Sequence, residues 1–195
     1  NSSITNISQL VGKKVGIFPG SNMKTLTKLA LRSYLDTGTI TFVELTPNLQ
    51  LEALSSGQID ALVSLEPIGT LAAEKLNARV IEVNFLAENL MNPMPTAGAI
   101  VSTKLISEKP EKAKKYAEAM AEAARFIKSN PSVAKQSLVK WLKLNASVAE
   151  KVGHYQYVPV SELDVNLLQG MANLLYENNV IEKEIIATTL FYENN

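Results

Sequence analysis

Residues 54–67 read L-S-S-G-Q-I-D-A-L-V-S-L-E-P, and this stretch decides the fold. Gly57 is placed as the left-handed C-terminal cap of a short apolar helix. Residues 59–65 are mostly apolar and too short for an independent helix, so they predict a strand buried on both faces, as in a parallel sheet. Glu66 and Pro67 follow at once, and the proline suits the first position of a helix.

Glu66 lies at the carboxyl end of this predicted strand, where open α/β sheets bind their ligands. We therefore expect its carboxylate to accept hydrogen bonds from a ligand amine, hydroxyl or amide. A carboxylate that interacts only with the dipole of the following helix is an equally good interpretation. Asp60 lies at the beginning of the same strand, at the end opposite to Glu66. A role in a turn or as a cap is the better interpretation there.

Strands and helices alternate on both sides of this stretch. Further strands are predicted at residues 14–18, 40–45 and 79–85, with helices between them. The order βαβαβαβ over residues 1–92 predicts a parallel-sheet α/β lobe with right-handed crossovers that binds the ligand.

The sequence N-P-M-P at residues 92–95 interrupts this alternation and suits a linker or a crossing between lobes. One more strand is predicted at residues 97–105, and helical patterns follow it. Trp141 lies on the apolar stripe of one of these helices and is expected in the core. Residues 93–195 therefore read as a return crossing, one strand and the C-terminal helices of an incomplete second lobe.

Composition removes several classes of function. The chain has 195 residues, with 19 basic and 19 acidic side chains, so no half offers the basic face that nucleic acids or anionic membranes need. It has no cysteine and one histidine, so metal sites built from these side chains and histidine-dependent catalytic triads are not expected. No catalytic constellation and no cofactor motif emerges, and this points toward binding.

The segment P-G-S-N, formed by Pro19, Gly20, Ser21 and Asn22, separates a predicted strand from a predicted helix. Backbone N–H groups and the helix dipole make such a position a ready site for an anion. An ordinary strand-to-helix turn with a serine cap is the commoner alternative. The segment is not a nucleotide fingerprint, because it has neither G-x-G-x-x-G nor G-K-[ST].

Three segments together resemble one family. They are L-V-G-K-K-V-G-I-F-P-G-S at residues 10–21, A-L-S-S-G-Q-I-D-A-L-V-S-L-E-P at residues 53–67, and K-P-E-K-A-K-K-Y-A-E-A at residues 109–119. They are similar, in order and spacing, to segments of periplasmic solute-binding proteins of the nitrate, sulfonate, taurine and thiamine-precursor type. Such proteins serve ABC importers and have the type 2 periplasmic-binding fold, in which two α/β lobes clamp a small ligand.

The resemblance implies that Gly20, Ser21 and Asn22, next to Pro19, contact a polar or anionic group of the ligand, and that Glu66 and Pro67 line the cleft. Two departures from the family limit this. Nothing here corresponds to the family's first lobe, so we expect the chain to be a C-terminal portion. Many members also have Trp where this chain has Leu65, so the identity of the substrate is not carried over.

The resemblance thus implies a non-enzymatic substrate-binding component of an ABC transporter, which captures a small-molecule ligand and works with a transporter permease. It implies a periplasmic protein or a cell-surface lipoprotein, without nucleic acid, cofactor or direct membrane insertion of this chain. Two alternatives stay open. One is a same-fold enzyme of thiamine-pyrimidine or menaquinone-precursor synthesis. The other is an effector-binding domain of the LysR type.

Overall fold

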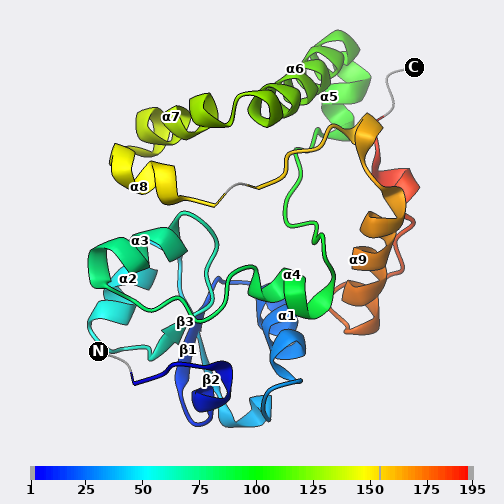
Figure 1. Ribbon diagram of the computed structural model, residues 1–195. Coiled ribbons are helices and arrows are strands. Elements are labelled where there is room, and N and C mark those ends of the chain that lie inside the picture. The colour runs from blue at the N-terminus through cyan, green and yellow to red at the C-terminus, as the bar shows by residue number, and fades with distance from the viewer. Residues whose placement is uncertain (1–2, 154, 193–195) are drawn as a thin grey trace. The chain divides into compact units, whose positions relative to one another are not determined.

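The computed structural model describes residues 3–153 and 155–192, with only the backbone of Ser21 (Figure 1). The chain divides into two compact units, each of which is described by itself. Unit 1 consists of Asn1–Met94 with two short later segments, Lys151–Gly153 and Asn178–Val180. Unit 2 contains the remaining segments, of which the longest is Pro95–Glu150.

Unit 1 is built on a three-stranded parallel sheet. Its strands are β1 (Lys14–Ile17), β2 (Thr41–Glu44) and β3 (Ala61–Leu62), in the order β2-β1-β3. In this register Val15 of β1 lies opposite Phe42 on one side and Ala61 on the other. The predicted α/β class with a parallel sheet is therefore confirmed.

Short helices precede, connect and follow the strands of unit 1, and local signals explain where several of them begin. Pro47 occupies the first turn of its helix, where its missing N–H costs nothing. Asp36 caps a 3-10 turn by accepting a hydrogen bond from Gly38 N. The elements are η1 (Ile7–Leu10), α1 (Ser21–Leu31), η2 (Thr37–Thr39), α2 (Pro47–Ser55), α3 (Ile68–Leu76) and α4 (Phe85–Leu90).

The core of unit 1 lies on both faces of the central strand. Val15 and Ile17 are fully buried in the cluster that also contains Leu31. Between them Gly16 faces the other side, where a Cβ atom would lie 2.6 Å from Ile59 Cδ1. A strand covered on both faces is typical of parallel sheets and explains its continuous apolar sequence.

The predicted strand at residues 79–85 is wrong. Ile81 and Phe85 pack against the core cluster, whereas Val80 and Val83 remain exposed. The segment therefore has buried and exposed side chains as a strand would, but it forms no backbone hydrogen bonds with the sheet. The edge strand β3 is only two residues long and offers few backbone groups for another strand to pair with. Asn84 then takes a left-handed conformation and starts α4 at Phe85.

The predicted strand at residues 97–105 is also wrong. Ser102 accepts a hydrogen bond from Leu105 N at 3.1 Å and so caps a helix that takes the end of this segment. Ile100 is 88% exposed, and no described residue of unit 2 belongs to a strand with which this segment could pair. An apolar extended segment becomes a strand only where a neighbour supplies hydrogen bonds.

All the regular secondary structure in the described residues of unit 2 is helical, and extended segments connect the helices. Pro110 and Pro131 each occupy the first turn of a helix, where a proline's missing N–H costs nothing. Among the described residues no helix has the length and apolar character that a bilayer crossing needs. The elements are α5 (Thr103–Glu108), α6 (Pro110–Ser129), α7 (Pro131–Leu142), α8 (Ala146–Lys151, whose last residue belongs to unit 1), η3 (Val160–Glu162), α9 (Val165–Glu177) and η4 (Ala187–Leu190).

The buried residues of unit 2 are mostly small. Ala113 and Ala124 are buried on α6, and Met171 on α9. The expectation that Trp141 lies in the core is wrong, because its side chain is 72% exposed. Its helix carries an apolar stripe, but no strand of unit 2 among the described residues covers that stripe.

Candidate functional site

The predicted ligand residues gather at one edge of the unit 1 sheet. Because the three strands are parallel, their carboxyl ends lie at the same edge. The loop with Pro19 and Gly20 follows β1, Glu44 is the last residue of β2, and Glu66 follows β3 by four residues. This carboxyl edge is our candidate site.

The loop after β1 depends on a glycine. Gly20 has φ 126° and ψ 144°, which favours a residue without a side chain, and a Cβ atom there would lie 2.9 Å from Asn22 Oδ1. Asn22 Oδ1 itself accepts a hydrogen bond from Met23 N at 2.8 Å. The amide oxygen of Asn22 is therefore engaged by the backbone, while Ser21 begins α1 and its side chain lies outside the described atoms.

A carboxylate already occupies the start of α1. Gly20 N donates a hydrogen bond to Glu44 Oε2 at 3.3 Å, and Glu44 is exposed. A free N–H at a helix start is the group that would bind an anion, so Glu44 competes with any anionic ligand for it. Glu44 was not identified from the sequence, although its position at the end of a predicted strand is the same signal that pointed to Glu66.

Glu66 lies over the first turn of α3. Its Oε2 accepts a hydrogen bond from Thr70 N at 3.3 Å, and its Oε1 lies 3.5 Å from where a Cβ atom of Gly69 would stand. Pro67 takes the capping position and α3 begins at Ile68, one residue later than predicted. Glu66 thus does contact the start of α3, and contact with a ligand stays a prediction.

A later segment of the chain also reaches this carboxylate. Gly153, in the segment Lys151–Gly153 of unit 1, has its Cβ position 3.8 Å from Glu66 Cγ. Lys151 Nζ lies 2.8 Å from Glu74 Oε1 of α3, which ties the same segment to that helix. A Cβ atom at position 153 would therefore be in ordinary van der Waals contact with Glu66.

The side chains at the carboxyl edge are mainly hydrogen-bond acceptors. Glu44 and Glu66 bring two carboxylates to it, and carboxylates accept hydrogen bonds from amines, hydroxyls and amides. Residues 3–153 and 155–192 contain no group of three or more His, Cys, Asp or Glu side chains that could hold a metal ion.

Asp60 lies at the other edge of the sheet. Its Oδ2 accepts a hydrogen bond from Lys14 N at 2.8 Å, and its own N donates to Lys14 O at 2.8 Å. These bonds join the beginnings of β1 and β3, so Asp60 has a structural role that links two strands, where the sequence predicts a role in a turn or cap.

Comparison with known proteins places the chain in a family. The family model described as NMT1/THI5 like matches residues 1–134, a range that includes the Gly20 loop, Glu44 and Glu66. The chain belongs to the NMT1/THI5-like family. No protein with a curated description matches this NMT1/THI5-like chain.

Solved structures show that the NMT1/THI5-like chain has the fold of periplasmic solute-binding proteins. The alkanesulfonate-binding protein SsuA from Xanthomonas axonopodis pv. citri, solved bound to MOPS, matches with a TM-score of 0.70 at 17% identity, over 98% of this chain and 66% of that one. The periplasmic aliphatic sulphonate binding protein SsuA from Escherichia coli matches with a TM-score of 0.67 at 23% identity, over 99% and 63%. The chain therefore spans less than two thirds of either SsuA protein.

The same fold also occurs in an enzyme. The desulfurization enzyme DSZB matches with a TM-score of 0.69 at 15% identity, over 100% of this chain and 72% of that one. At these identities the structural matches establish the fold of the NMT1/THI5-like chain and leave its activity to other arguments.

Proposed function

We propose that this chain is part of the substrate-binding component of an ABC transporter, which captures a small polar solute at the carboxyl edge of unit 1. The observation that carries the proposal is the convergence of the Gly20 loop, Glu44 and Glu66 at that edge, within the range that the family model matches. Ligands of open α/β sheets bind at this edge. The SsuA proteins that share the fold bind their ligands as solute-binding proteins, which supports the same role.

The two carboxylates bear on the class of solute. Sulfonate, nitrate and bicarbonate are anions, and an anion at the start of α1 would meet Glu44 at the same N–H. A thiamine-precursor pyrimidine is neutral and carries an amino group, which can donate a hydrogen bond to a carboxylate. Of the classes that the resemblance leaves open, we therefore favour the amino-bearing pyrimidine over the anions.

Calorimetry on the full-length protein tests this proposal with a panel of sulfonates, nitrate, bicarbonate and aminopyrimidines. We expect saturable binding of an aminopyrimidine, which Glu44→Gln weakens because the variant loses a charged acceptor. Glu52→Gln is the matched control, since it removes one exposed carboxylate from α2 and should leave affinity unchanged. Tight sulfonate binding that Glu44→Gln strengthens would reverse our choice of solute, and no binding anywhere in the panel would contradict the transport role.

The partner and the location belong to the same proposal. A substrate-binding component delivers its solute to the permease of its ABC transporter, and it works outside the cytoplasmic membrane. We accordingly place the protein in the periplasm or, as a lipoprotein, at the cell surface. Co-purification with a permease in detergent, abolished when the solute is withheld or the permease is deleted, tests the partnership.

The match to DSZB favours one alternative, an enzyme on the same fold. Its catalytic groups would have to come from a chain with no cysteine and one histidine, His154, which lies outside the described residues. A turnover assay with the solute that calorimetry identifies separates the two functions. A released product would support the enzyme, and recovery of the unchanged solute would support the binding protein.

A further inference from the structure

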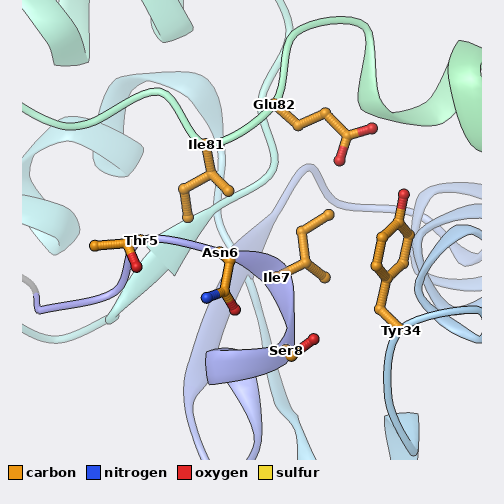
Figure 2. A pocket seen from close by; sticks show the side chains of 7 residues that line it. All are labelled: Thr5, Asn6, Ile7, Ser8, Tyr34, Ile81 and Glu82. Carbon is orange, nitrogen blue, oxygen red and sulfur yellow. The ribbon is translucent and has the colours of Figure 1, made fainter.

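Unit 1 has a recess away from the carboxyl edge. Its volume is about 210 Å³, and it lies between residues 5–8, Tyr34 and the segment 81–82 (Figure 2). Tyr34 follows the C-terminal end of α1, and a helix that links parallel strands ends near the amino edge of the sheet. The recess is therefore separate from the site proposed above and does not depend on the proposed function.

A hydrogen-bond network fixes the polar groups of this recess. Tyr34 Oη donates to Asn89 Oδ1 at 2.8 Å, while Asn89 Nδ2 donates to Glu82 Oε1 at 3.0 Å and to Phe85 O at 2.7 Å. The hydroxyl proton of Tyr34 is therefore used inside the protein, and its oxygen can act toward the recess only as an acceptor. Figure 2 shows the Tyr34 hydroxyl and the Glu82 carboxylate directed toward one another.

The other lining residues include further hydrogen-bond acceptors and the apolar side chains of Ile7 and Ile81. Thr5 Oγ1 donates to Gln9 Oε1 at 3.3 Å, so the Thr5 proton is also used within the protein. Ile7 is 8% exposed and belongs to the core cluster against which Ile81 packs. No lysine or arginine lines the recess, so the charge of Glu82 is not balanced within it.

We infer that this recess binds a primary ammonium group on a short aliphatic stem. The ammonium has three donors and no acceptor, so it can donate to the Glu82 carboxylate and to the Tyr34 oxygen, which lie at the same end of the recess (Figure 2), and its charge balances that of Glu82. The stem would lie on Ile7 and Ile81. The recess is smaller than the roughly 300–1,000 Å³ of pockets for drug-sized molecules, so the ligand has few heavy atoms.

The test uses n-butylammonium chloride as the probe and the 195-residue chain, with methyl resonances of Ile7 and Ile81 followed by NMR. We expect saturable shifts of both methyl groups with n-butylammonium, and none with n-butanol at the same concentrations. Glu82→Gln should weaken binding about tenfold, the loss expected for one charge-assisted hydrogen bond. The glutamine still offers an oxygen to Asn89, so the network and the fold are retained.

Two further variants make the result decisive. Glu52→Gln removes a carboxylate from α2 and should bind n-butylammonium as the unaltered chain does. Tyr34→Phe removes the second acceptor and should also weaken binding, which keeps the test valid if Glu82→Gln fails to fold. Equal shifts with n-butanol, non-saturating shifts, or equal affinity in Glu82→Gln and Glu52→Gln would each overturn the inference.

Discussion

At the scale of the residue, Glu66 has two roles that a pair of substitutions separates. Its Oε2 accepts from Thr70 N in the first turn of α3. We expect Glu66→Ala to lower the free energy of unfolding by about 1 kcal/mol, the usual cost of losing a helix-start acceptor, and Glu66→Gln to lower it less. Urea denaturation measures both.

If Glu66 also faces the solute, both variants lose affinity in calorimetry on the full-length protein, because neither retains the charge. An unchanged affinity in Glu66→Gln would remove Glu66 from the candidate site and leave it only its place at the start of α3.

A second residue-scale prediction concerns Gly16. A Cβ atom there would lie 2.6 Å from Ile59 Cδ1 and 3.1 Å from Leu62 Cδ1, and Ile59 is 1% exposed. We expect Gly16→Ala to lower the free energy of unfolding by about 1–3 kcal/mol, because the packed core must move to admit a methyl group. Gly98→Ala is the control in the same urea experiment, since nothing lies within 4 Å of its Cβ position.

At the scale of the element, one side chain holds the C-terminal segment to α9. Gln169 Nε2 donates to Ile185 O at 2.9 Å, and Gln169 Oε1 accepts from Ala187 N at 2.8 Å. We expect Gln169→Ala to cost about 1–3 kcal/mol, because it leaves partly buried backbone groups without their partner. Hydrogen exchange at the Ala187 amide should accelerate strongly, and unchanged exchange there would contradict this role.

Elements whose cause is local could be predicted from the sequence. Pro47, Pro110 and Pro131 each mark a helix start, and the structure has all three. The strands at residues 79–85 and 97–105 could not be predicted in this way, because a strand exists only with a partner, and partners are not encoded within the segment. Ile81 shows the difference, since it is inside the core without belonging to the sheet.

The same limit applies to the candidate site. Gly20 and Glu66 were predicted because each follows its own strand, which is a local signal. The bond between Gly20 N and Glu44 Oε2 joins residues 24 apart and depends on β2 lying next to β1. Strand order is set by packing across the whole unit, so the contact between Glu44 and the Gly20 loop could be identified only in the structure.

At the scale of the whole molecule, the two units differ in what they bury. Unit 1 buries Val15, Ile17, Leu31 and Ile59 around its sheet, whereas much of what unit 2 buries is alanine. Buried apolar area stabilises at roughly 25 cal/mol per Å², so unit 1 should be the more stable. Native-state hydrogen exchange should show the slowest amides in β1 and faster ones in α6, and the reverse order would contradict this.

Trp141 gives a second whole-molecule measurement, because it is the single tryptophan of the chain. Its side chain is 72% exposed, so we expect acrylamide to quench its fluorescence nearly as efficiently as that of free tryptophan. Leu142→Ala, beside it on α7, should leave this quenching unchanged. Strong protection from acrylamide would show that the apolar face of α7 is covered in solution.

Unit 1 is made of three separate lengths of chain, and this has a consequence during synthesis. A ribosome releases Asn1–Met94 well before Lys151–Gly153, and at about 5–20 residues per second the delay is roughly 3–12 seconds. During that interval Glu74 has no Lys151 to pair with, and the surroundings of Glu66 lack Gly153. The nascent sheet can therefore form before residues 151–153 are synthesised, whereas its carboxyl edge reaches its final form only after them.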